Sequence, residues 1–414
     1  MTSSMTLDRL QAACREDAAI RYVARLQPAG GEGEKVFPPT YEGGEYALES
    51  RVVDGRRVPC VLLDSVQSQA NRMESALLDA HRAKRLKLPL ITVDFVKAGV
   101  PEVGVVTSLD APHRMADAIL RDSTLNGVSF RKSPIGKVLD TASLANAAEL
   151  FGVCPTALLF GLWDSAGPRG GLGTKFARAI VGEVVAFDIE VGKRPSSRLD
   201  PLGIRGHVGE VYQAKATDNG LAWTLDPALA NNSKGGTPIL CKEKGHGKPS
   251  EINHGNVTPS LKNEKGQPHH GGVTFAYARQ SIVISLSGLR KLRFPIGADS
   301  NDDRDLAGRT VLAALGLCAS TLATLLGGDL RSRCALVPDA GHPARTELVH
   351  GDGTVELLTL TVDDAVLLFS QAVSAAQKVG LPWHNEPIEL VPHVELARLV
   401  KQSHEIAMQS SGEE

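Results

Sequence analysis

A glycine-rich basic loop between two apolar segments is the feature that most constrains how this chain can fold. The apolar run TALLFGLW begins at Thr156, the loop DSAGPRGGLGTK follows, and FARAIVGEVVAF up to Asp188 is typical of a helix. We therefore predict a strand, a loop and a helix. Such a junction can hold a phosphate, because glycines let backbone N–H groups approach a ligand and a helix N-terminus adds partial positive charge. The loop supplies Gly167, Gly170, Gly171, Gly173 and Thr174, with full charges on Arg169, Lys175 and Arg178.

Known nucleotide and hydrolase motifs fit this loop badly. A P-loop needs a hydroxyl residue after its lysine to hold magnesium, and Phe176 follows Lys175 here. The glycine spacing also departs from the dinucleotide-binding fingerprint. Ser165 lies in a sequence that lacks the first glycine of a nucleophile elbow. Two interpretations stay open: a tight turn with solvated charges, or a site for a phosphate-bearing partner, which we favour.

A second strand-to-helix junction lies at Asp64–Glu74. The segment before it, Arg51–Leu63, alternates like a hairpin with Asp54-Gly55 at its turn. Apolar residues then recur at helical spacing, so the first two turns of the helix carry the polar residues Ser65, Ser68, Gln69, Asn71 and Arg72. Polar residues at a helix start are commonly caps and surface groups. Binding is the alternative that their number suggests.

Composition excludes several classes of protein. The chain has 414 residues, a net charge of −2 and a pI near 6.6, which argues against a surface coated with nucleic acid but permits one basic groove. Six scattered cysteines without C-x-x-C pairs suit a reducing cytoplasm, and the polar N-terminus does not resemble a signal peptide. The apolar stretch Val311–Leu326 contains glycine, serine and threonine and is predicted to be a buried core helix.

The order of the remaining elements predicts an α+β fold with long insertions. Residues 1–190 and 271–414 are expected to form one domain, and 191–270 a basic, loop-rich insertion. The stretch Asn231–Gly272 is rich in lysine and histidine, but no histidine or cysteine pair has the spacing of a zinc site, so no metal is expected. Predicted helices are Leu7–Arg15, Asp303–Leu326 and Asp363–Val379; predicted strands are Ala19–Leu26, Val273–Leu286, Ala335–Val337 and Val355–Val362.

Four long motifs carry a resemblance to a known family. They are PPTY at Pro38–Tyr41, DSVQSQANRME at Asp64–Glu74, LLFGLWDSAGPRGGLGTKFARAIVGE at Leu158–Glu183 and SEINHGNVTPS at Ser250–Ser260. The chain resembles the backbone subunits of subtype I-G (earlier I-U) CRISPR Cascade complexes, which belong to the RAMP superfamily. The resemblance implies an RRM-like, ferredoxin-like palm with an inserted thumb. It also implies several copies lined up along one CRISPR RNA.

The resemblance assigns candidate RNA-binding residues. In related backbone subunits, a serine- and glutamine-rich helix start followed by basic residues contacts the guide backbone. The residues here that resemble it are Ser65, Gln67, Gln69, Asn71 and Arg72. The loop adds Arg169, Gly170, Gly171, Gly173, Thr174, Lys175 and Arg178, and further candidates are Lys242, Lys244, Lys248, His254 and Arg279. Expected partners are CRISPR RNA, the target DNA strand paired to it, copies of the chain and other Cascade subunits, in the cytoplasm, with no cofactor and no membrane.

We expect no catalytic activity. Backbone subunits of a different CRISPR class cleave RNA with a loop aspartate, but Asp64 and Asp164 are predicted to be caps or turn residues. Aromatic residues make up only 4% of the chain and no RNP-type strand is visible, so base stacking is not expected. Two alternatives remain: a free-standing single-strand nucleic-acid binder, and a phosphate-handling enzyme that uses the 165–175 loop.

Overall fold

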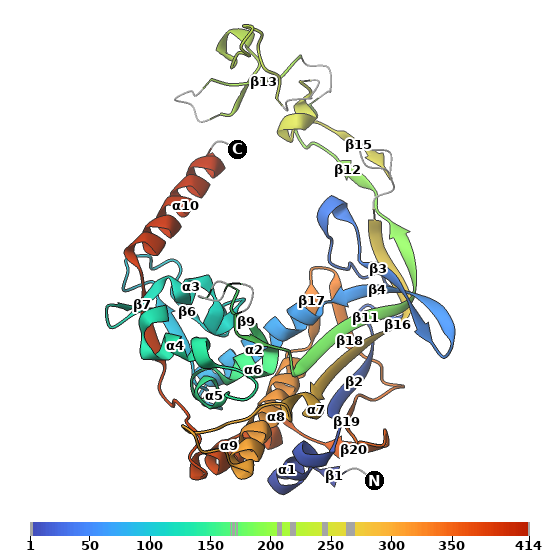
Figure 1. Cartoon of the computed structure of the whole chain (residues 1–414). Helices are drawn as coiled ribbons and strands as arrows, with labels where there is room; N and C mark the ends of the chain where they lie inside the picture. The colour runs from blue at the N-terminus through green and yellow to red at the C-terminus, as the bar shows by residue number, and fades with distance from the viewer. Residues whose placement is uncertain are drawn as a thin grey trace. The chain divides into compact units, whose positions relative to one another are not determined.

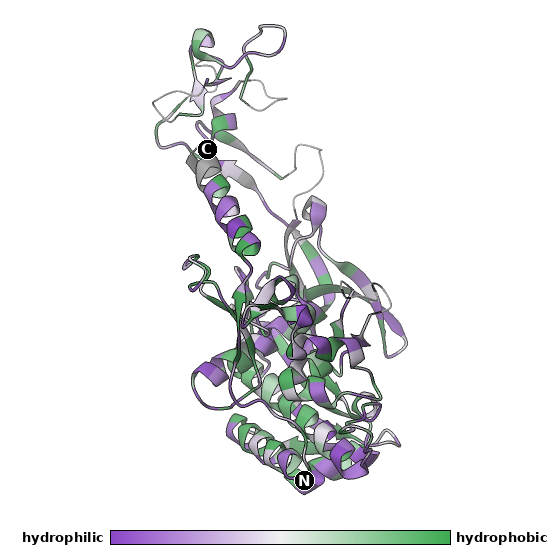
Figure 2. Ribbon diagram, turned by 60° about the vertical axis from the view of Figure 1, so that its left-hand side comes forward, coloured by the Kyte–Doolittle hydropathy of each residue, from purple (hydrophilic) through white to green (hydrophobic). Residues whose placement is uncertain are grey.

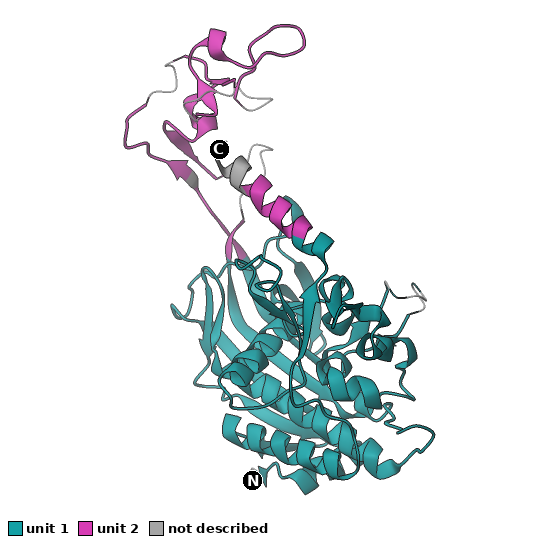
Figure 3. Cartoon of the chain, turned by 90° about the vertical axis from the view of Figure 1, so that its left-hand side faces the viewer, with its two compact units in different colours: residues 1–190, 273–397 teal, residues 191–272, 398–414 magenta. Residues whose placement is uncertain are grey.

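The described residues form two compact units. The computed structural model describes residues 3–165, 167, 170, 173–204, 209–215, 221–241, 247–261 and 270–412. Residues 1–190 and 273–397 make the first unit, and 191–272 and 398–414 make the second (Figure 3). The last residues of the chain therefore group with the insertion, whereas we expected all of 271–414 in the palm.

The first unit is built on a ferredoxin-like βαββαβ order. Its six elements are β2 (Ala19–Pro28), α2 (Val66–Arg82), β11 (Ile180–Lys193), β16 (His270–Ser285), α8 (Asp302–Leu325) and β19 (Arg345–Val349). The four strands lie in the spatial order β19-β2-β16-β11, and β16 and β19 are both antiparallel to β2 (Figure 1). This is the strand order of the ferredoxin-like fold. The expected α+β class with an RRM-like palm is confirmed.

Further strands widen the palm sheet at both edges. The hairpin of β3 (Leu48–Val53) and β4 (Arg56–Asp64) pairs with β11. Its turn has positive φ at Asp54 (48°) and Gly55 (76°), as the Asp-Gly pair predicts. The other strands of the sheet are β1 (Ser3–Ser4), β20 (Val355–Thr359), β17 (Gly328–Arg331) and β18 (Cys334–Pro338).

Helices pack together in a layer beside this sheet. α8 contacts α2, α1 (Leu7–Glu16) and α9 (Val362–Lys378). Asn301 caps α8, and Thr361 with Asp364 forms a capping box at the start of α9. By length and composition α8 could cross a membrane, but 83% of its apolar window is buried inside the protein. In Figure 2 the apolar residues gather inside the first unit, which agrees with a core helix.

A second, five-stranded sheet in the first unit was not predicted. Its spatial order is β6-β5-β21-β7-β8. The strands are β5 (Ile91–Asp94), β6 (Val105–Thr107), β7 (Ser123–Leu125), β8 (Val128–Ser129) and β21 (Ile388–Pro392), and nearby short helices are α3 (Ala118–Arg121), α4 (Pro134–Thr141) and α5 (Ala148–Val153). The sequence signal is weak because each strand has at most five residues and the central one comes from near the C-terminus.

The second unit is rich in loops. β12 (Ser196–Arg198) pairs with β15 (Val257–Ser260), and β13 (Tyr212–Gln213) with β14 (Trp223–Thr224). Short 3₁₀ turns lie at Pro227–Leu229 and Pro249–Ile252, and α10 (Val394–Gly412) contributes its later part.

The predicted strand, loop and helix at 156–188 are wrong on both sides of the loop. The apolar run forms the short helix α6 (Pro155–Phe160), and the segment after the loop becomes the long strand β11. A fully buried apolar run has no periodicity that separates helix from strand. The alternating, β-branched sequence after Ile180 packs between β16 and β4 in the sheet. Because β10 and then β11 follow the loop, the helix start that the dipole argument required is not formed at its end.

Candidate nucleic-acid interface

The start of α2 presents only part of its predicted polar set to solvent. Ser65 is the N-cap, and its hydroxyl accepts a hydrogen bond from the Ser68 amide at 3.2 Å. Gln67 and Asn71 are exposed, four residues apart, and so lie on one face of the helix. These two side chains are free to meet a ligand.

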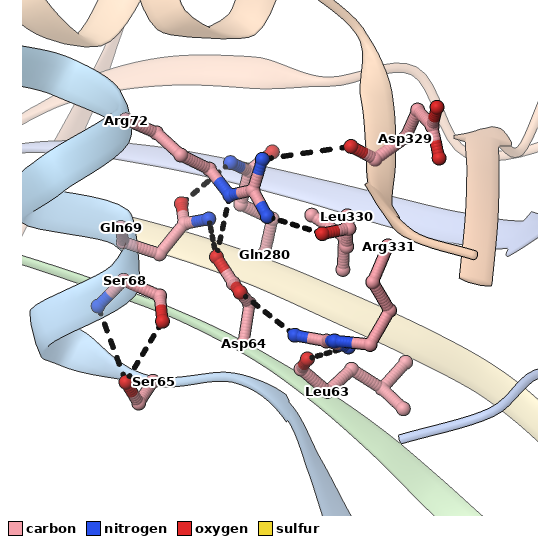
Figure 4. Close-up of polar contacts among 10 residues, drawn as sticks. All are labelled: Leu63, Asp64, Ser65, Ser68, Gln69, Arg72, Gln280, Asp329, Leu330 and Arg331. Carbon is pink, nitrogen blue, oxygen red and sulfur yellow. Dashed lines mark hydrogen bonds and ion pairs between the residues drawn. The ribbon is translucent and has the colours of Figure 1, made fainter. Parts of the chain in front are cut away.

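Gln69 and Arg72 belong to a buried polar network around Asp64, which is 1% exposed (Figure 4). The Asp64 carboxylate accepts hydrogen bonds from Gln69 Nε2 at 2.6 Å and Arg72 Nε at 3.0 Å. Arg331 approaches from β17, with Nη2 at 3.1 Å from Asp64 Oδ1 and Nη1 at 2.7 Å from the Leu63 carbonyl.

The same network ties α2 to two other strands. Gln280 Nε2 on β16 donates to Gln69 Oε1 at 2.9 Å, and Arg72 Nη2 donates to the Leu330 carbonyl on β17 at 2.6 Å. Gln69 is only 3% exposed. The structure thus bonds Gln69 inside the protein, whereas the Arg72 side chain is tied to Asp64 and Leu330 but stays 36% exposed. RNA contact by these two residues stays a prediction.

The glycine-rich loop is held at its base by a two-stranded ribbon of β9 (Leu162–Trp163) and β10 (Lys175–Phe176). The Asp164 amide donates to the Thr174 carbonyl at 2.8 Å. A Cβ on Gly173 would lie 1.9 Å from the Asp164 carbonyl oxygen, so this closure requires glycine. Thr174 donates its hydroxyl to the Leu139 carbonyl at 2.6 Å, which adds a second anchor at the base of the loop.

Asp164 is anchored below the ribbon. It is 5% exposed and pairs with Arg131 at 2.9 Å, and Arg131 also pairs with Asp140 at 2.9 Å. Its carboxylate pairs with an arginine, a contact that differs from the cap or turn role predicted for it. Gly170 has a φ of 53°. The candidates Arg169, Gly171, Lys242 and Lys244 lie outside the described residues.

Among the described residues of this segment, Lys175 and Arg178 carry positive charge. Both are exposed, and neither has a carboxylate partner within the described part of the chain. The Lys175 ammonium lies 5.2 Å from the centre of the Trp163 ring. Partial burial, and then the charge of Arg114, lower the pKa of Arg178. The charge of Glu74 acts on Arg178 in the opposite direction, but that carboxylate is already paired with Arg114. A partly desolvated guanidinium without a salt bridge of its own is well suited to an anionic ligand.

A buried ion pair joins the two junctions. Arg114 forms a bidentate pair with Glu74 of α2, with Nε at 2.6 Å and Nη2 at 2.9 Å from its two oxygens. Its third nitrogen, Nη1, donates at 2.9 Å to the carbonyl of Gly161, just before β9. The side chains are only 3% (Glu74) and 8% (Arg114) exposed, and burial raises the pKa of the Glu74 carboxyl. Sequence reasoning missed Arg114, because nothing near it marks a partner forty residues away.

The palm sheet carries two arginines over two stacked rings. Tyr277 and Phe187 are parallel, with centroids 5.1 Å apart. The guanidinium of Arg25 lies 4.5 Å from the Tyr277 centroid, and that of Arg279 lies 4.9 Å from Phe187. Arg25 and Arg279 are also cross-strand partners. This face therefore offers cations rather than bare rings, and Arg279 is exposed without an ion pair among the described residues.

Two of the four candidates in the second unit lie within the described residues. Lys248 is exposed and precedes the 3₁₀ turn at Pro249–Ile252. His254 is partly buried, and its ring meets Trp223 edge-on at 6.1 Å. No group of three or more potential metal ligands occurs within the described ranges.

A pocket of about 330 Å³ lies elsewhere in the first unit. Its lining includes Ile20, Tyr22 and Ile284 from the sheet and Leu317 and Thr321 from α8, with no charged side chain. Such walls do not suit a phosphate, and none of the candidate residues lines it.

Fold and site together define an α+β protein with a ferredoxin-like palm, a loop-rich insertion and an exposed basic ribbon next to the palm. Residues 20–191 match the family of CRISPR-associated protein GSU0053. This segment, less than half of the chain, holds β2, α2, the glycine-rich loop and most of β11. The match relates this segment to CRISPR-associated proteins, in agreement with the resemblance read from the motifs.

One solved structure aligns with most of this chain at low sequence identity. Csc2 from Thermofilum pendens, a solved structure, aligns over 89% of this chain and 78% of its own with 11% identity. The TM-score of this alignment is 0.25. No curated protein matches the sequence.

Proposed function

We propose that this chain is a non-catalytic, CRISPR RNA-binding backbone subunit of a type I-G Cascade complex, acting in the cytoplasm. The observation that carries the proposal is the pair of exposed cations, Lys175 and Arg178, at an anchored ribbon within the segment that matches CRISPR-associated proteins. Neither cation has a salt-bridge partner among the described residues. Contacts to phosphate and sugar tolerate any sequence, which a subunit needs when its guides vary. Copies of the chain would line up along the guide, beside other Cascade subunits, and support pairing with target DNA.

Absence of catalysis is part of the proposal. The two aspartates that could act in cleavage are each bonded to arginine, Asp64 to Arg72 and Arg331, and Asp164 to Arg131. These ion pairs support the proposal that neither carboxylate acts in cleavage. Cleavage of bound RNA that is lost on Asp164→Asn would contradict this part.

Assembly on RNA is the direct test of the proposed function. We expect purified protein to gain mass in steps as single-stranded RNA is lengthened, and to do so equally on unrelated sequences. Size-exclusion chromatography with light scattering measures this. One protomer per RNA at every length would instead identify a free-standing single-strand binder.

Lys175→Ala is expected to weaken binding to unrelated RNA sequences about equally. The slope of log affinity against log salt should fall by about 0.7, the value for one lost contact to single-stranded phosphate. Lys378→Ala, which removes an exposed lysine at the end of α9, is the matched control and should leave the slope unchanged. A loss confined to one RNA sequence would argue against backbone recognition. Fluorescence anisotropy titrations at several salt concentrations measure both variants.

A further inference from the structure

The β9–β10 ribbon points its side chains alternately inward and outward. Leu162, Asp164 and Phe176 are buried at 5%, 5% and 4% exposure, and Thr174 bonds to the backbone beneath. The residues between them, Trp163 and Lys175, are directly opposite each other in the ribbon. They therefore share its outer face.

Trp163 is unusual for a tryptophan because it is 50% exposed. Within the described residues its ring meets no other aromatic ring, and its indole N–H has no hydrogen-bond partner. In contrast, Trp383 packs against Phe151 and Phe369, with centroids 5.3 and 6.0 Å apart. The ribbon thus presents a large aromatic surface to solvent and holds a lysine ammonium over it.

We propose that Trp163 is a stacking platform for a nucleobase of single-stranded RNA, while Lys175 binds the adjoining phosphate. This inference rests on the proposed function and changes it in one respect, because the sequence predicted no base stacking. An exposed aromatic ring beside an uncompensated cation is the arrangement that single-strand binders use, and it tolerates any base. The palm sheet is a poorer platform, since Phe187 is fully buried and already stacks on Tyr277.

The anchoring of the ribbon supports a binding role. The Asp164–Arg131 pair, the Thr174 hydroxyl and the close approach at Gly173 fix the backbone on each side of Trp163 and Lys175. A platform held in this way loses little conformational freedom on binding. A protein interface is the less favoured occupant, because lysine is depleted at interface cores.

The test compares RNA with an abasic oligonucleotide of the same length. For Trp163→Ala we expect about a 10-fold loss of affinity for oligouridine, within the range for one stacked base, and less than a 2-fold change for the abasic strand. Trp163→Phe should retain most of the affinity, since it keeps a ring. Lys175→Ala should weaken both ligands equally.

Tryptophan fluorescence provides a second readout that a purely structural role would not move. Oligouridine should quench the wild-type protein more than the Trp163→Phe variant, and the difference should vanish with the abasic strand. The inference is overturned if Trp163→Ala binds oligouridine as tightly as wild type, or loses both ligands equally. It is also overturned if that variant alters self-association without RNA. Wild-type protein that binds no RNA would overturn the proposed function as well.

Discussion

Replacing Glu74 with alanine is expected to lower the free energy of unfolding by about 3–5 kcal/mol, because the buried guanidinium of Arg114 would lose its counter-charge. Both side chains of the pair are almost fully buried, so water cannot readily replace the lost carboxylate. Urea denaturation followed by tryptophan fluorescence and circular dichroism measures the change. We expect RNA binding to weaken too, since Arg114 also holds the Gly161 carbonyl at the entry to the ribbon.

Asp79→Ala is the matched control for this variant. Asp79 is an acidic residue of the same helix, but it is exposed. Its removal should change the free energy of unfolding by no more than about 0.5 kcal/mol. Equal effects of Glu74→Ala and Asp79→Ala would show that the buried pair contributes nothing measurable.

Asp64→Ala is expected to destabilise the protein by about 2–4 kcal/mol. The variant removes the carboxylate that Gln69, Arg72 and Arg331 share, and Gln69 would be left buried with one unpaired end. The expected loss is smaller than at Glu74 because the arginine side chains are 36% and 26% exposed and can be hydrated. Thermal and urea unfolding measure it.

An exposed ion pair provides the control for Asp64→Ala. Asp363 pairs with Arg85 at 2.9 Å, but its side chain is 92% exposed. Asp363→Ala should therefore cost less than about 1 kcal/mol. If Asp64→Ala were as mild as Asp363→Ala and RNA affinity fell sharply, the network at the start of α2 would be a ligand site rather than a structural one.

Much of the palm could be predicted because its signals are local. The Asp54-Gly55 turn, the Ser65 cap, the Thr361 cap and the alternation in β16 each depend on residues close together in sequence. The second sheet could not be predicted, since short strands become stable only when a distant strand, β21, completes them. The run at 156–162 was misassigned for a related reason: it is completely buried, so it has no polar side whose spacing would distinguish a helix from a strand.

The candidate site, too, could be predicted from the sequence only in part. Residue types indicated a basic glycine loop, and Lys175 and Arg178 are indeed exposed there. Trp163 could not be recognised as a site residue from the sequence. Strand pairing places Lys175 opposite it, and no sequence spacing indicates that pairing. Arg114 was missed because its partner lies on another helix.

The sequence by itself determined the α+β class, the ends of the main helices and the presence of a basic, glycine-rich loop, because capping, turn chemistry and composition act over a few residues. Only the tertiary structure decided which polar side chains at the start of α2 face solvent. Gln67 and Gln69 are the same residue type two positions apart, yet one is exposed and the other is bonded to Asp64 and Gln280. Their difference arises from β16 and β17, strands more than two hundred residues away, packing against one side of the helix.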